Sequence, residues 1–154
     1  MTAPVAEPLK LIALDADDLN IISAHLQDAV LRASDIAFRP NEKRFVLAVR
    51  RYDWEGAQAG HKRRRLSALH FERVTAVQSS RLDPRATDAI HNLLAVTFAA
   101  TESPAGEVTL HFSEGAAIRL TVECIEAQMK DLGPMWETRN EPDHSAAEPT
   151  DGQG

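Results

Sequence analysis

Four segments of the chain alternate apolar and other side chains with a period of two, and this pattern constrains the fold more than any other feature. They are residues 45–50, 94–98, 108–113 and 118–122. Successive side chains of a β-strand point to opposite faces of a sheet, so the pattern is typical of strands with one buried face. Residues 64–78 also read as extended, with a bend near Glu72 and Arg73, where the alternation changes phase.

The connections between these segments are short and rich in turn-forming residues, as in 39–42, 103–106 and 113–116. Short connections join antiparallel neighbours, whereas a parallel pair needs a crossover of about a dozen residues or more. We therefore expect an antiparallel sheet of about six strands, preceded by a short strand near residues 11–14.

Two helices are expected to flank these strands. The first begins after Asp15, a suitable N-cap, and its apolar residues are Leu19, Ile22, Leu26 and Ala29. The second is expected over residues 123–132, where a similar spacing recurs and Gly133-Pro134 provides a stop signal. Its apolar stripe consists of Val122, Ile125, Met129 and Leu132.

These elements indicate an α+β fold, in which a curved antiparallel sheet or small barrel carries an N-terminal helix and a C-terminal capping helix. This order resembles the pleckstrin-homology-like barrel, in which the last helix closes one opening. The analogy concerns the fold alone and implies no function.

The length indicates one globular domain, expected over residues 8–137 of the 154, because domains usually contain roughly 100–200 residues. Residues 1–7 are expected to be a frayed N-terminus. Residues 138–154 are expected to form a disordered acidic tail, because they contain no aliphatic side chain larger than Ala and cannot offset the entropy of ordering.

The compartment expected for the protein is the cytoplasm. The single Cys124 fits a reducing environment, and the first residues lack the basic and apolar regions of a signal peptide. No apolar run approaches the roughly 20 residues that span a bilayer, so no transmembrane segment is expected.

The charges are unevenly distributed along the chain. The formal net charge of −6 argues against a general nucleic-acid binder, yet residues 32–85 carry 13 Lys and Arg against 6 Asp and Glu. Basic side chains in this region could bind phosphate in RNA, in a lipid headgroup or in a phosphorylated protein. The alternative is a solvated loop that keeps the protein soluble. The candidate anion-binding residues are Arg50, Arg51, Lys62, Arg63, Arg64 and Arg65.

No other pattern in the sequence predicts a catalytic, metal or cofactor site. No pair of histidines has metal-ligand spacing, and the Asp15 region is explained by helix capping. Cys124 lies beside Glu123 and Glu126, whose charges disfavour a reactive thiolate.

Two stretches of the chain resemble a family of small alphaproteobacterial proteins, domain of unknown function 2948. One runs from Leu14 to Ala29. The other runs from Ile118 to Ala127 and continues into Asp131-Leu132-Gly133-Pro134 and Trp136. The resemblance covers about residues 8–137, and it implies no activity, ligand or catalytic residue.

Three functions remain open on the sequence. The leading hypothesis is a non-catalytic binding or accessory module that engages an anionic partner through its basic face. The second is a structural or assembly subunit that pairs with another chain through a sheet edge. The third is a small enzyme whose site assembles only in three dimensions, from residues such as His70, Arg119 and Glu123. The partner expected is a protein or an anionic molecule, and no cofactor is expected.

Overall fold

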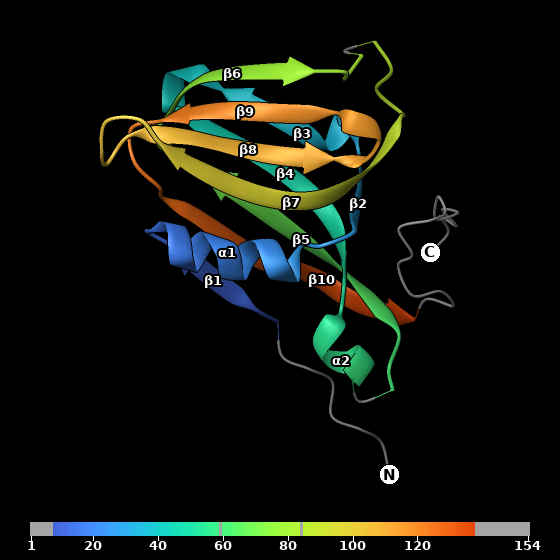
Figure 1. Ribbon diagram of the computed structural model, residues 1–154. Helices are drawn as coiled ribbons and strands as arrows, with labels where there is room; N and C mark the ends of the chain where they lie inside the picture. Colours follow the sequence, from blue (N-terminus) through green and yellow to red (C-terminus); the bar gives the residue numbers. More distant parts are fainter. Residues whose placement is uncertain (1–7, 59, 84, 138–154) are drawn as a thin grey trace.

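Ten strands form one curved antiparallel sheet in the computed structural model, which describes residues 8–58, 60–83 and 85–137 (Figure 1). The strands are β1 Lys10–Ala13, β2 Ala29–Arg32, β3 Ile36–Arg39, β4 Arg44–Tyr52, β5 Arg63–Phe71, β6 Val74–Ser80, β7 Ile90–Ala100, β8 Gly106–Phe112, β9 Ala117–Val122 and β10 Ala127–Glu137. The helices are α1 Ala16–His25 and α2 Trp54–Gln58. The fold is therefore mostly β, and the expected balance of helices and strands is not found.

The strands follow the order β1-β10-β5-β4-β2-β7-β8-β9-β6, and β3 pairs with β4 outside this path. Each pairing among the described residues is antiparallel, as the short connections predicted. The two end strands, β1 and β6, are not paired with each other in that part of the chain, so the sheet curves without closing. Within the described residues, no helix has the length and apolar character needed to cross a membrane.

The expected N-terminal helix is confirmed. The Asp15 side chain accepts a hydrogen bond from the Asp18 backbone N–H at 2.8 Å, and the four apolar residues of the predicted stripe are all buried. The helix packs beside β7, whose Val96 N–H donates to Ser23 Oγ at 2.9 Å. The helix thus covers a part of β7 that β2 does not reach.

The expected C-terminal helix is wrong, because residues 127–137 form the strand β10 between β1 and β5. Ala127, Met129 and Asp131 are buried, whereas Lys130 and Leu132 are exposed, so burial alternates with a period of two. Ile125 and Met129 are buried as expected. Residues four positions apart share one face in a strand as well as in a helix, so both patterns bury this pair. Gly133-Pro134 does not end the element, and the register with β5 instead shifts between Asp131 and Met135. The pleckstrin-homology-like analogy relied on that helix.

Two further segments differ from expectation. Residues 54–58, before the basic run, form the short helix α2, which the sequence pattern did not predict. In β7, the alternation over residues 94–98 would place Leu94 on the same face as Val96, but Leu94 is exposed while Leu93 and Val96 are buried. The register of β7 against β8 shifts between Leu93 and Ala95, and this bulge changes the face to which Leu94 points.

The bend predicted near Glu72 and Arg73 is confirmed. Arg73 has a left-handed φ of 62°, and it separates β5 from β6. The two strands do not pair with each other: β5 pairs with β4 and β10, while β6 pairs with β9 at the other end of the sheet. The expectations for residues 1–7 and 138–154 lie outside the described residues.

Candidate functional site

The six candidate anion-binding residues lie together at one end of the β4–β5 pair. Arg51 is opposite Arg65 in the register, and Arg50 is opposite Leu66. Their exposure differs sharply: Arg51, Arg64 and Arg65 are only 2%, 6% and 3% exposed. Arg50 and Arg63 are half-buried, and Lys62 is exposed. Three of the six side chains therefore lie inside the protein and do not belong to a solvated loop.

Asp131 of β10 explains why two of these arginines point inward. Its Oδ1 accepts hydrogen bonds from Arg51 Nε at 2.8 Å and from Ser67 Oγ at 2.6 Å. Its Oδ2 accepts from Arg51 Nη2 at 2.9 Å and from the Leu9 backbone N–H at 2.7 Å. Arg65 Nη1 lies 3.5 Å from the same oxygen. One buried carboxylate thus joins β4, β5, β10 and the start of the described chain.

The surroundings of Asp131 keep it ionised. Burial is the largest effect and raises the pKa of this carboxyl group. The hydrogen bonds from Arg51, Ser67 and Leu9, with the positive charge of Arg51, oppose burial and together outweigh it. The net pKa of Asp131 lies below its ordinary value, so the carboxylate is charged at neutral pH.

Arg64 points to the other side of the sheet from Arg65. Its Nη1 donates to the Arg50 carbonyl at 3.1 Å, and its guanidinium carbon lies 5.7 Å from the centre of the Tyr52 ring. Tyr52 in turn packs edge-to-face on Trp54, with ring centres 4.7 Å apart. The Trp54 indole N–H donates to the Gln27 carbonyl at 3.1 Å. Tyr52 and Trp54 are therefore both in contact with the protein itself.

The more exposed members of the basic group are also paired, apart from Lys62. Arg63 Nη2 lies 3.4 Å from Asp53 Oδ2, and Arg50 Nη1 lies 3.8 Å from Asp35 Oδ2. Lys62 forms no ion pair with any described residue. Two buried donors in this region, Nη1 of Arg51 and Nε of Arg63, have no hydrogen-bond acceptor among the residues that the structure describes.

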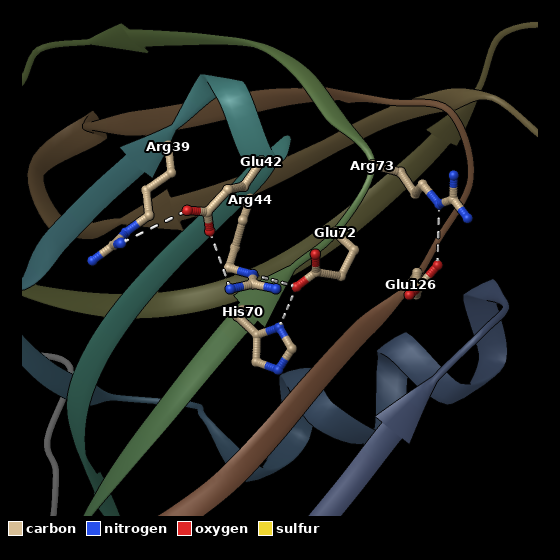
Figure 2. Close-up of polar contacts among 7 residues, drawn as sticks. All are labelled: Arg39, Glu42, Arg44, His70, Glu72, Arg73 and Glu126. Atoms are coloured by element: carbon tan, nitrogen blue, oxygen red, sulfur yellow. Dashed lines mark hydrogen bonds and ion pairs between the residues drawn. The ribbon is translucent and has the colours of Figure 1, made fainter.

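A second group of charges lies on the surface at the opposite end of β4 and β5, and Figure 2 shows how its members pair. Glu72 Oε2 is 2.8 Å from Arg44 Nε and 2.9 Å from His70 Nδ1. Arg73 Nε is 3.4 Å from Glu126 Oε1. Burial raises the pKa of Glu72, but the hydrogen bonds from Arg44 and His70 hold it below its ordinary value. In this network each carboxylate has a cationic neighbour, so its charges are matched internally.

The residues considered for an assembled enzyme site make separate ion pairs. His70 contacts Glu72, Arg119 Nε lies 3.9 Å from Glu107, and Glu123 accepts from Lys43 Nζ at 2.8 Å. Over the described ranges, no group of three or more His, Cys, Asp and Glu side chains is placed to hold a metal ion. The described contacts do not join the three residues into one site.

The family of the chain follows from comparison with known proteins. The model of a family described as "Protein of unknown function (DUF2948)" matches residues 9–144, which is most of the chain. The chain belongs to this family. No curated protein and no solved structure matches the DUF2948 chain. The comparisons therefore assign it a family without a known activity.

One surface of this DUF2948 domain was not anticipated by the sequence analysis. β6 is the last strand in the sheet order, and five of its seven residues are exposed. Its sequence, Val74 to Ser80, contains no charged residue and no proline, and it lies between Arg73 and Arg81. An uncharged strand of this length between two arginines was visible in the sequence, but its place at the edge depends on the sheet order.

Proposed function

We propose that this domain is a non-catalytic binding module that takes an extended segment of another protein at the outer edge of β6. An edge strand presents backbone N–H and C=O groups that can pair with an added strand. Proteins usually protect such edges with short strands, charged residues or prolines. The observation that carries the proposal is that β6 has none of these three protections over residues 76–80; a register shift against β9, of the kind that also protects edges, is confined to its start between Val74 and Ala76.

The other edge strands of the sheet differ from β6. β1 and β3 each contain four residues, and each carries a basic residue, Lys10 in β1 and Arg39 in β3. β6 contains seven residues and pairs only with β9 among the described strands. A seven-residue strand offers several backbone hydrogen bonds on its outer side, which is enough to recognise an extended segment.

Photo-crosslinking in the native cell tests the proposal. A photoreactive residue replaces Gln78 on β6 and, as a control, Lys130 on β10, which is also exposed. We expect a crosslinked protein that is specific to position 78. When that protein is purified and added, amide exchange in β6 should slow at alternate residues. No crosslink above that at position 130, or unchanged exchange in β6, contradicts the proposal.

Proline substitution provides a structural control. Successive N–H groups of β6 point to opposite edges, so one of Val77 and Gln78 donates toward β9 and the other points outward. Proline at the inward donor should destabilise the fold, whereas proline at the outward donor should leave the fold intact and abolish binding. Circular dichroism identifies which variant folds. A folded proline variant that still binds the partner contradicts strand addition.

The basic group supports a second proposal, because Nε of the half-buried Arg63, next to the exposed Lys62, lacks an acceptor among the described residues. A small anion such as phosphate, bound near Lys62 and Arg63, would provide an acceptor for Arg63 Nε, a donor that is unfavourable when left unpaired. We expect inorganic phosphate to raise Tm at constant ionic strength, and Lys62→Ser with Arg63→Gln to reduce that rise. If phosphate raises the Tm of the wild type no more than chloride does, this binding is excluded.

A further inference from the structure

The charges around β6 restrict which segment can bind there. Arg73 and Arg81 bracket the strand, both with left-handed φ, at 62° and 60°. Both are exposed, and Arg81 forms no ion pair with any described residue. On the neighbouring strand β9, Arg119 lies opposite Gln78 and is also exposed. The uncharged edge therefore has an arginine at each end and a third on the neighbouring strand.

Two of these arginines, Arg73 and Arg119, pair with carboxylates of this chain that another carboxylate can easily displace. Glu126 lies 3.4 Å from Arg73, and Glu107 lies 3.9 Å from Arg119, and all four side chains are well exposed. Exposed pairs of this kind contribute little stability, because water competes for both partners. A carboxylate from a bound segment can therefore replace or join them.

A second copy of this chain fits the edge poorly. In an antiparallel β6–β6 pair centred on Val77, Arg73 of one copy would lie opposite Arg81 of the other, and the same contact would occur at both ends. Like charges directly opposite each other in a sheet are destabilising. The charge pattern favours a different polypeptide with acidic residues at the two ends of the pairing region.

The core-facing side chains of β6 and β3 indicate which residues the bound segment carries between its acidic ends. Val77 is opposite the buried Leu120 in the register, yet Val77 is only partly buried. Ile36 and Phe38 of β3 are opposite the buried Leu47 and Phe45, and they too are only partly buried. β3 is not paired with β6 in the described part of the sheet, which leaves these core-facing side chains incompletely covered.

The start of β6 lies close to the turn that follows the end of β3. Val74, the first residue of β6, donates its backbone N–H to the carbonyl of Lys43 at 2.9 Å. Lys43 follows the short turn Pro40–Glu42 that leaves β3. A strand added along β6 from this end would direct every second side chain toward the core face. Apolar side chains at those positions would cover Val77 and approach Ile36 and Phe38.

We infer that β6 binds an extended acidic segment of another protein, with apolar residues at alternate positions and carboxylates at both ends. The apolar residues cover the core-facing side of the edge, and the carboxylates pair with Arg73 and Arg81. This inference rests on the proposed strand addition and adds the chemistry of the partner.

A library of displayed random peptides about twelve residues long, long enough to span the strand, tests the inference against the full-length protein. Enriched peptides should combine alternate apolar residues with acidic ends, and they should slow amide exchange in β6. The double variant Arg73→Gln, Arg81→Gln should bind such a peptide about tenfold more weakly, and added salt should weaken binding to the wild type. The matched control is Arg32→Gln, Arg85→Gln, which removes two exposed arginines outside β6 and should bind like the wild type.

The outcomes separate the two proposals. Peptides that protect β6 but show no acidic preference, or that bind the Arg73 and Arg81 variant as tightly as the wild type, overturn the inference and leave strand addition standing. Enriched peptides that leave β6 exchange unchanged overturn both. A library that yields no binder to the wild type also overturns both, because an edge of this kind should select peptides from random sequence.

Discussion

Arg51 and Asp131, 80 residues apart in the chain, face each other inside the sheet through two hydrogen bonds of 2.8 and 2.9 Å. This side-by-side geometry is the arrangement in which a guanidinium binds a carboxylate most strongly. Because both side chains are removed from water, each depends on the other for its charge to be compensated. The pair therefore offers the most sensitive point at which to test the fold.

Replacing Asp131 with Asn should destabilise the protein by about 3–5 kcal/mol, because it leaves Arg51 and Arg65 buried beside a neutral group. Urea unfolding at neutral pH measures the change. The control is Glu126→Gln, which removes one member of an exposed ion pair and should change the unfolding free energy by less than about 1 kcal/mol. Equal losses in the two variants would mean that the buried pair is no more important than the surface pair.

The same carboxylate predicts a pH dependence. The pKa of Asp131 is lowered in the folded protein, so its ionised form stabilises the fold at pH values above the ordinary carboxyl pKa of about 4. This contribution is lost as the pH falls through the lower, folded-state value. Between neutral pH and about pH 3, the wild type should lose more unfolding free energy than Asp131→Asn. Parallel pH profiles for the two proteins would contradict the assignment.

Substitutions in β10 distinguish a strand from the helix that the sequence predicted. A helix would place Met129 and Leu132 on the same face, whereas the strand buries Met129 and exposes 54% of Leu132. We expect Met129→Ala to cost about 2–5 kcal/mol in unfolding free energy and Leu132→Ser to change it by about 0.5 kcal/mol or less. Thermal or urea unfolding of both variants measures this. Comparable losses at the two positions would favour the helix.

Gly106 is expected to tolerate no side chain. A Cβ at this position would lie 2.5 Å from the Ala99 carbonyl oxygen and from the Phe98 ring, because Gly106 pairs with both β7 and β9. Gly106→Ala should destabilise the protein by about 1–3 kcal/mol through overpacking. Thr109→Ala, at a half-buried position elsewhere in β8, provides a comparison outside the crowded contact. A stability equal to the wild type would show that β7 can move away from β8.

Removing the N-cap of α1 should have a smaller effect. Asp15→Ala deletes the acceptor for the Asp18 N–H and should cost about 0.5–2 kcal/mol. Asp15→Asn or Asp15→Ser retains a capping oxygen and should recover most of this loss. If all three substitutions were equivalent, the cap would not contribute to stability.

The sequence predicted the features that depend on local patterns. The alternation in β4, β8 and β9 and the N-cap at Asp15 are encoded within a few residues, and the structure confirms them. Residues 123–132 were ambiguous, because apolar residues spaced by three and four can also satisfy an alternating pattern at several positions. The partner that decides between the two readings is β5, which lies more than 50 residues earlier in the chain.

The candidate sites were harder to predict for the same reason. The basic run is visible in the sequence, but the burial of Arg51 and Arg65 depends on Asp131, which is distant in sequence. The exposed edge of β6 depends on the sheet order, in which β5 and β6 are neighbours in the chain but lie at different places in the sheet. Neither relationship leaves a signal in the local residue pattern.

The position of Asp131 near the end of the domain also has a consequence for protein synthesis. Ser67, the residue closest to Asp131 in sequence among those that contact its side chain, precedes it by 64 residues. At a translation rate of about 5–20 residues per second, the nascent chain waits roughly 3–13 seconds between Ser67 and the arrival of this carboxylate. Until then Arg51 and Arg65 have no internal counter-charge from Asp131 and favour contact with water over burial. Among the described strands β10 leaves the ribosome last, and it thus controls when the interior of this sheet can close.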